Sequence, residues 1–255
     1  KEHYNGEFTS EETLKNVTLQ DVINHYNTYF VPANAYLVVI GDVKTKDVKK
    51  KVEQLFGADV WKKATAPNLT YNDPKDLQYS QINFVDVPNA VQSEIALINL
   101  SKLKMTDKDY FAAILANQIL GGGGEGRLFL NLREKHGWTY GSYSNLGASK
   151  YISKFSSTAS VRNAVTDSAV VEIFNELRKI RTDLVSEEDL KNAKAKYIGN
   201  FVMQIEKPAT IARYALNIKT LGLPEDFYEN YVKNINAVTP EDVRNAANKY
   251  FLADN

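Results

Sequence analysis

The chain has 255 residues, enough for one large domain or two smaller ones, and its 31 basic and 31 acidic residues cancel, so it lacks the basic footprint of nucleic-acid-binding proteins. The absence of cysteine excludes disulfides, iron–sulfur clusters, cysteine-ligated zinc and a thiol nucleophile. The longest apolar run, residues 35–40, is too short to span a membrane, so we expect a soluble protein of the cytoplasm or the periplasm.

Residues 17–34 and 238–255 form an internal repeat. Nine of their eighteen positions are identical at a constant spacing of 221 residues. Each copy opens with a threonine, Thr18 or Thr239, followed three residues later by an aspartate, a pattern typical of a capped helix start. Two capped helices can match by coincidence, but the length of the match favours a duplicated unit. The chain would then hold the tail of one copy and most of the next.

A strand and a second helix are expected after the first copy of the repeat. The first helix ends before Pro32, which cannot continue it. Residues 35–40 are typical of a buried strand, and the lysine-rich residues 43–56 carry apolar side chains at helical spacing. We therefore interpret residues 1–60 as the tail (helix–strand–helix) of a preceding repeat unit and residues 61–78 as a linker.

The second unit, residues 79–255, is predicted to combine paired strands with helices. A hairpin is expected around Pro88, and Thr106 is the expected cap of the first helix. Because the strands come in pairs, the pattern indicates an α+β fold, a mostly antiparallel sheet with helices packed on one face, followed by a helical tail. By the repeat, this unit stops before its last strand. Strands are expected at residues 80–87, 93–100, 139–146 and 152–161, and helices at 107–120, 126–136, 164–181, 186–204, 208–220, 224–234 and 240–251.

A glycine-rich loop separates two of these predicted helices. With Gly126, its glycines Gly121, Gly122, Gly123 and Gly124 match the Gly-x-Gly-x-x-Gly pattern of dinucleotide-binding proteins. That pattern binds pyrophosphate only after a strand, whereas the residues before it here are helical. We therefore expect a mobile connection between helices and no nucleotide.

No metal site is predicted in this chain. Its three histidines, His3, His25 and His136, are scattered along the sequence. Glu2-His3 could end a His-x-x-Glu-His zinc motif, but the first three positions of that motif are missing.

Residues 126–141 carry the most informative pattern, Gly-Arg-Leu-Phe-Leu-Asn-Leu-Arg-Glu-Lys-His-Gly-Trp-Thr-Tyr-Gly. It predicts a helix, a turn at Gly137 and a strand that begins near Tyr140. A reversal of the chain at Gly137 can bring Arg133 and Tyr140 to one surface. On the pattern alone, an ordinary helix–turn–strand with a surface arginine and a half-buried tyrosine is the simpler explanation.

This segment resembles the C-terminal-half signature of the pitrilysin/insulinase zinc peptidases, which include the mitochondrial-processing peptidases. The shared features are a glycine-rich loop, an Arg-Leu-Phe-x-x-Leu-Arg helix and a tyrosine seven residues after the last arginine. The resemblance covers nearly the whole chain. Residues 18–42 are similar to the family's helix, Pro-x-Asn turn and strand, residues 186–196 to its Glu-x-x-Leu-x-x-Ala-Lys helix, and the 221-residue spacing to its duplicated α+β units.

The resemblance implies the substrate-binding, non-zinc domain of a metalloendopeptidase that cleaves unfolded peptides. By position, Arg133 and Tyr140 would contact the substrate across a chamber, and residues 121–124 would act like the glycine-rich loop of the processing peptidase's non-zinc subunit. His-x-x-Glu-His is absent from the sequence, so this chain is expected to hold no metal and to be inactive alone. The zinc would lie upstream in the polypeptide or on a partner subunit of the same family.

An alternative follows from the same resemblance. The core subunits of a respiratory complex are similar in fold, so the chain could be an inactive structural or assembly subunit. Retention of both Arg133 and Tyr140 favours the peptidase interpretation, because a scaffold has no use for that pair. The partners would then be a zinc-bearing domain and a peptide, with no nucleic acid and no membrane span.

Overall fold

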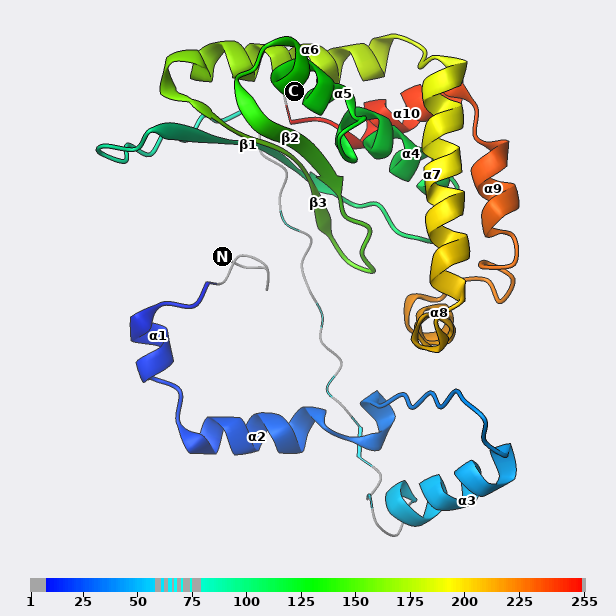
Figure 1. Ribbon diagram of the computed structural model, residues 1–255. Helices are drawn as coiled ribbons and strands as arrows, with labels where there is room; N and C mark the ends of the chain where they lie inside the picture. Colours follow the sequence, from blue (N-terminus) through cyan, green and yellow to red (C-terminus); the bar gives the residue numbers. More distant parts are fainter. Residues whose placement is uncertain are drawn as a thin grey trace. The chain divides into compact units, whose positions relative to one another are not determined.

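The computed structural model (Figure 1) describes residues 8–57, 61, 64–65, 67, 70, 74 and 79–253. Glu2, His3 and most of the predicted linker at 61–78 lie outside the described residues. The chain forms two compact units. The first comprises Lys1–Lys75 with Lys207–Leu216, and the second comprises Asp76–Glu206 with Asn217–Asn255.

Before the linker, the described residues of the first unit form the helices α1 (Glu11–Lys15), α2 (Leu19–Tyr29) and α3 (Thr45–Phe56), with a 3₁₀ turn at Pro32–Asn34. The strand predicted at residues 35–40 is wrong, because these residues form no strand in the structure. Tyr36 and Leu37 are each 61% exposed. A strand needs a neighbour to pair its backbone groups, and none of the described residues pairs with this segment.

The repeat has the same local structure in both copies. Helices α2 and α10 (Pro240–Tyr250) each span 11 residues, and each starts with a capping box. Thr18 Oγ1 accepts a hydrogen bond from the Asp21 nitrogen at 3.2 Å, and Thr239 Oγ1 accepts one from the Asp242 nitrogen at the same distance. The packing differs, because α2 has no buried residue whereas α10 buries one face. Local sequence therefore sets the helix, and the neighbouring elements set its burial.

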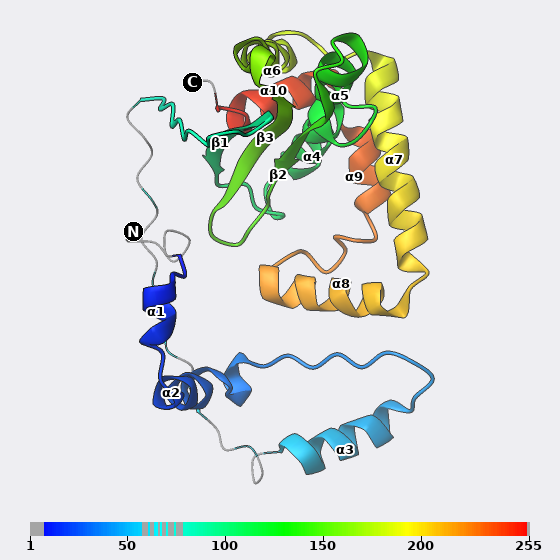
Figure 2. The same ribbon diagram turned by 60° about the vertical axis from the view of Figure 1, so that its left-hand side comes forward.

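The second unit is built on a three-stranded antiparallel sheet of order β1-β3-β2, in which Ile95 of β1 pairs with Ala159 of β3. Figures 1 and 2 show α4, α6 and α10 gathered on one face of this sheet. This arrangement confirms the predicted α+β fold. The strands are β1 (Gln92–Ser101), β2 (Thr139–Leu146) and β3 (Ser153–Arg162), and the helices are α4 (Tyr110–Gly121), α5 (Arg127–Phe129), the π-helix η3 (Leu130–Lys135), the 3₁₀ turn Asn163–Val165, α6 (Thr166–Thr182), α7 (Glu187–Ile205), α8 (Pro208–Leu221, shared by the two units), α9 (Tyr231–Ala237) and α10.

The core lies between the sheet and these helices. Alternate residues of β1 and β3 point inward, and Phe155 stacks on Phe251 with ring centroids 4.5 Å apart. Helix α4 is central, since nine of its 12 residues are buried. The opposite face of the sheet stays open among the described residues, with Ile98 52% and Tyr143 44% exposed. The sheet thus has one packed face and one free face.

Three predictions in the second unit are corrected. Residues 80–87 form no strand, since none of the described residues pairs with them and Ile82 is 97% exposed, although β1 at the edge of the sheet has one side without a neighbouring strand. Thr106 does not cap α4, which starts three residues after Asp107. The Asp107 carboxylate accepts the Lys104 N–H at 2.9 Å and so holds a preceding turn. The helix predicted at 224–234 begins only at Tyr231, after a series of turns.

Candidate functional site

The helix that carries Arg133 changes its pitch along its length. It starts as α5 after Gly126 and continues as the π-helix η3, where the His136 nitrogen donates to the Asn131 carbonyl at 3.2 Å. π-Helical turns are rare and frequently lie at functional sites. Gly137, with φ of +62°, then reverses the chain into β2. The predicted helix–turn–strand is therefore present.

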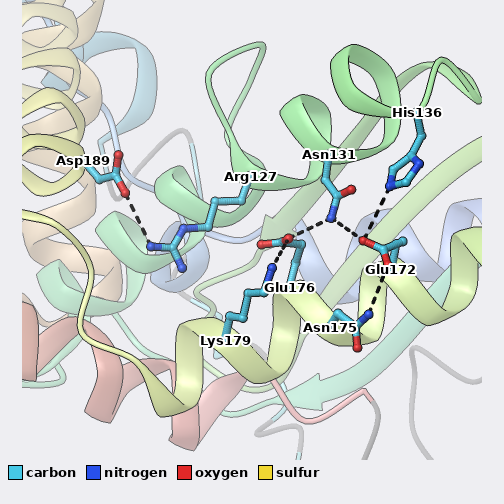
Figure 3. Close-up of polar contacts among 8 residues, drawn as sticks. All are labelled: Arg127, Asn131, His136, Glu172, Asn175, Glu176, Lys179 and Asp189. Atoms are coloured by element: carbon cyan, nitrogen blue, oxygen red, sulfur yellow. Dashed lines mark hydrogen bonds and ion pairs between the residues drawn. The ribbon is translucent and has the colours of Figure 1, made fainter.

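A polar cluster fixes η3 to α6 (Figure 3). The Asn131 side-chain nitrogen donates to Glu172 Oε2 and to Glu176 Oε1, both at 2.8 Å. Asn175 donates to the other oxygen of Glu172 at 3.2 Å, and Lys179 donates to Glu176 at 3.1 Å. Asn131 and Glu176 are 7% and 6% exposed, so their bonds lie in a weakly screened environment. One amide thus bridges two carboxylates on successive turns of α6.

The same cluster sets the electrostatics behind the π-helix. The hydrogen bond from Asn131 is the main reason that the pKa of Glu172 is lowered below its usual value. His136 Nε2 lies 3.8 Å from Glu172 Oε2, and its ring stacks on Trp138 at 4.1 Å. Asn131 was not among the residues predicted from the sequence, because a buried asparagine between two carboxylates gives no signal in sequence.

Arg133 lies on the exposed side of η3. Its guanidinium carbon sits 4.9 Å from the ring centroid of Phe129, a cation–π contact. It also reaches Glu134 at 3.2 Å, but both side chains are about half exposed, so this ion pair is weak. The ring beneath Arg133 therefore orients a guanidinium whose remaining N–H groups face solvent.

A β-bulge at the start of β2 exposes Tyr140. Thr139 pairs with Val161 and Ser142 with Ala159, so β2 carries one extra residue here. Strict alternation would turn Tyr140 to the same side as the fully buried Ser142, yet Tyr140 is 88% exposed. Thr139 Oγ1 accepts the Gly141 N–H at 3.1 Å and stabilises the bulge.

The aromatic ring of Phe129 links the surrounding elements. Its centroid lies 5.9 Å from that of Tyr143, whose hydroxyl end lies beside Gly141. A Cβ atom built on Gly124 would meet the same Phe129 ring at 3.8 Å. The exposed or partly exposed residues on the elements around Phe129, namely Gly122, Gly123, Gly124, Arg133, Tyr140 and Tyr143, are together called the Arg133 surface.

The four predicted loop glycines do not have equivalent positions. Gly121 is buried, and a side chain there would clash with the Ser144 backbone nitrogen. Gly123 has φ of +137°, a conformation that L side chains rarely adopt, and Gly124 is exposed. Gly122, Gly123 and Gly124 therefore offer backbone at the surface, while Gly121 packs the loop onto the sheet.

Arg133 and Tyr140 are both exposed and lie on consecutive elements, η3 and β2. No hydrogen bond or cation–π contact joins them, although both fall within the described residues. The contacts run from Arg133 through Phe129 and Tyr143 to Gly141, the residue that follows Tyr140. The bulge and the stack under Arg133 were missed by the sequence analysis. Gly141, a glycine inside a strand pattern, was the one available signal for the bulge.

The described residues do not fit a catalytic metal. No group of three or more histidine, aspartate or glutamate side chains among them could ligate an ion. His25 and His136 lie on separate elements, α2 and the end of η3. Within the same part of the chain, no helix is long and apolar enough to cross a membrane.

The sequence of this chain matches a known protein family. The model of the peptidase M16 inactive domain matches residues 16–197. The probable inactive metalloprotease YmfF of Bacillus subtilis is 24% identical over 250 residues, which cover 98% of this chain and 56% of that protein. An uncharacterized zinc protease of Rickettsia felis is 27% identical over 257 residues, or 95% of this chain and 57% of that protein. The chain thus spans a little more than half the length of these relatives.

Solved structures share the fold at low sequence identity. A peptidase M16 inactive domain from Pseudomonas fluorescens has a TM-score of 0.85 at 23% identity, covering 96% of this chain and 57% of that one. A protease from Helicobacter pylori has a TM-score of 0.84 at 20% identity, covering 95% and 58%. At such identities the likeness establishes the fold.

Proposed function

Since this chain belongs to the peptidase M16 family, as its resemblance to the pitrilysin/insulinase peptidases predicted, we propose that it is the substrate-binding, non-zinc part of a metalloendopeptidase that acts on unfolded peptides. The observation that carries the proposal is the Arg133 surface. It exposes a guanidinium held on an aromatic ring, a phenol raised by a bulge and a loop with uncovered backbone.

Each of these groups suits a peptide. The Arg133 guanidinium presents a planar set of donors that matches peptide carbonyls or a carboxylate. The Tyr140 hydroxyl can donate to a scissile carbonyl as negative charge develops on its oxygen, which lowers the barrier for attack. Gly122, Gly123 and Gly124 lack side chains, so an extended peptide can approach their backbone closely. Gly121 supports the loop from below.

The metal is proposed to lie on another domain or subunit of the family. The relatives include proteins named zinc proteases, whereas the described residues hold no ligand set and the sequence lacks His-x-x-Glu-His. The first unit also exposes many apolar side chains on α2 and residues 35–40, among them Val22, Tyr36 and Leu37. Exposed apolar side chains of this number are typical of a surface that packs against further protein.

The alternative is an inactive structural subunit. The word "inactive" in the name of the Bacillus relative supports it, as does the fold likeness to a chain of Complex III2 from Candida albicans, with a TM-score of 0.70 at 12% identity. A structural subunit needs the exposed apolar side chains of α2 and residues 35–40 to pack against its partners, but it does not need the Arg133 surface. The two proposals therefore differ in what substitutions at Arg133 and Tyr140 do.

The test is cleavage of a labelled unfolded peptide by this chain together with the zinc-bearing domain or subunit. Tyr140→Phe removes one oxyanion donor and should lower kcat by about 100-fold with little change in KM. Arg133→Gln should raise KM and weaken binding of the peptide to this chain alone. Arg162→Gln, which removes an exposed charge at the end of β3, is the matched control and should change neither.

Two results would contradict the proposal. If kcat/KM is unchanged in both variants, the Arg133 surface does not contact the substrate. If the wild-type assembly binds no peptide and cleaves none, the chain is a structural subunit.

A further inference from the structure

Lys196 of α7 reaches the glycine-rich loop from a distant part of the sequence. Its Nζ donates to the Gly122 carbonyl at 3.2 Å, and a Cβ built on Gly123 would lie 3.0 Å from that nitrogen. The Gln118 side chain donates to the same carbonyl at 3.0 Å. Gly122 caps the C-terminus of α4, where a cation is favourable. This contact uses one of the three N–H groups of the ammonium.

The positive charge of Lys196 is not compensated within the described residues. None of their carboxylates lies within ion-pair distance of its ammonium, and the side chain is only half-buried. The backbone N–H groups of Gly123, Gly124 and Glu125 likewise donate to no acceptor among the described residues. The loop therefore carries three backbone amides without a backbone acceptor, next to an ammonium that has no carboxylate partner among the described residues. This donor set is complementary to an oxygen anion.

The Lys196 ammonium adjoins the Arg133 surface. Lys196 touches the loop at Gly123, and Gly124 lies beside the ring of Phe129, on which Arg133 stacks. A peptide bound along this surface would pass from the Arg133 end to the Lys196 end over exposed glycine backbone. Each end then presents a cation, and only the Lys196 end adds free amides.

We propose that Lys196 is a specificity-determining residue that selects peptides carrying a carboxylate over the glycine-rich loop. The inference rests on the proposed peptide-binding function and adds a substrate class to it. The carboxylate can come from an aspartate or glutamate side chain or from the C-terminus of the peptide. The matching chemistry is the same, a charge-assisted hydrogen bond from the ammonium together with the loop amides.

Four labelled unstructured peptides of one length test this inference by fluorescence anisotropy with the full chain. The first pair differs only by a central aspartate or asparagine, and the second pair ends in a free carboxylate or an amide. The wild-type chain should prefer the charged member of at least one pair by about three- to tenfold, as expected for a partly exposed charge pair. The pair that shows the preference identifies the source of the carboxylate.

Lys196→Gln should abolish this preference while still offering an N–H to the Gly122 carbonyl, so the loop keeps its anchor. Lys196→Arg should restore it, and Lys191→Gln, at an exposed lysine of the same helix, should leave it intact. A preference that persists in Lys196→Gln, or is absent from the wild type while peptides still bind, overturns the role of Lys196 alone. Failure of all four peptides to bind overturns the proposed function with it.

Discussion

Replacing Asn131 by alanine tests whether its amide holds the π-helix to α6. The amide makes two hydrogen bonds to carboxylates, each at 2.8 Å, and bonds to charged groups contribute about 1.5–3 kcal/mol. The side chain of Glu172 is 22% exposed and can recover a hydrogen bond to water, so the bond to Glu172 counts at the low end. Glu176 is 6% exposed and, among the described residues, would keep Lys179 as its one partner. We expect Asn131→Ala to lower the free energy of unfolding by about 3 kcal/mol.

Unfolding in urea is followed by the fluorescence of Trp138, which stacks on His136, in a Trp61→Phe background that removes the other tryptophan. A loss of about 3 kcal/mol corresponds to a Tm lower by about 6–12 °C for a domain of this size. The control is Asn175→Ala, which removes one bond of 3.2 Å to Glu172 and should cost less than about 1 kcal/mol. Equal losses in the two variants would refute the bridging role of Asn131.

Three further predictions concern stability and its dependence on pH. Gly121→Ala should destabilise the fold by about 2 kcal/mol or more, because its Cβ would clash with Ser144, whereas Gly124→Ala has room beside Phe129 and should cost less than about 1 kcal/mol; thermal unfolding separates them. The pKa of Glu172 is lower in the folded than in the unfolded chain, so its stabilising contribution is present above the unfolded pKa and is lost as pH falls through the folded value. Urea midpoints below pH 5 should therefore fall more steeply for the wild type than for Glu172→Gln, and parallel curves would contradict this. Gly199→Ala, in a helix with nothing within 4 Å of the new methyl group, should raise the stability by about 0.5–1 kcal/mol in the same assay.

Most helices and strands of the second unit could be predicted, because the residue pattern within each segment determines its secondary structure. The strands at 139–146 and 152–161 are present within a residue of their predicted bounds, and the glycines at 121–124 and 137 follow helix ends where expected. The errors occurred where the outcome depends on distant partners. Residues 80–87 carry a strand-like pattern, but a strand also needs a partner, and β1 has only β3 beside it among the described residues.

The site was partly predictable from sequence for the same reason. Arg133 and Tyr140 were singled out by their spacing, and both side chains are exposed, but their role at a site stays a prediction. The bulge that exposes Tyr140 depends on the register of β2 against β3, and Lys196 reaches the loop across 74 residues of sequence. Only the folded structure shows the bulge and the Lys196 contact, because neither follows from the residues next to Tyr140 or Lys196 in the sequence.

The two ends of the glycine-rich loop touch each other. A Cβ on Gly126 would lie 2.8 Å from the Gly121 Cα, so the backbones at the loop's entry and exit are in van der Waals contact. The residues between them form a loop with its two ends in contact, so the length of this loop can change without moving the helices on either side. Doubling the number of residues in such a loop costs only about 0.6 kcal/mol of loop-closure entropy. Insertions after Gly124 would therefore leave the scaffold intact, which makes this loop a natural place for related chains to differ in length and for a recognition tag to be grafted.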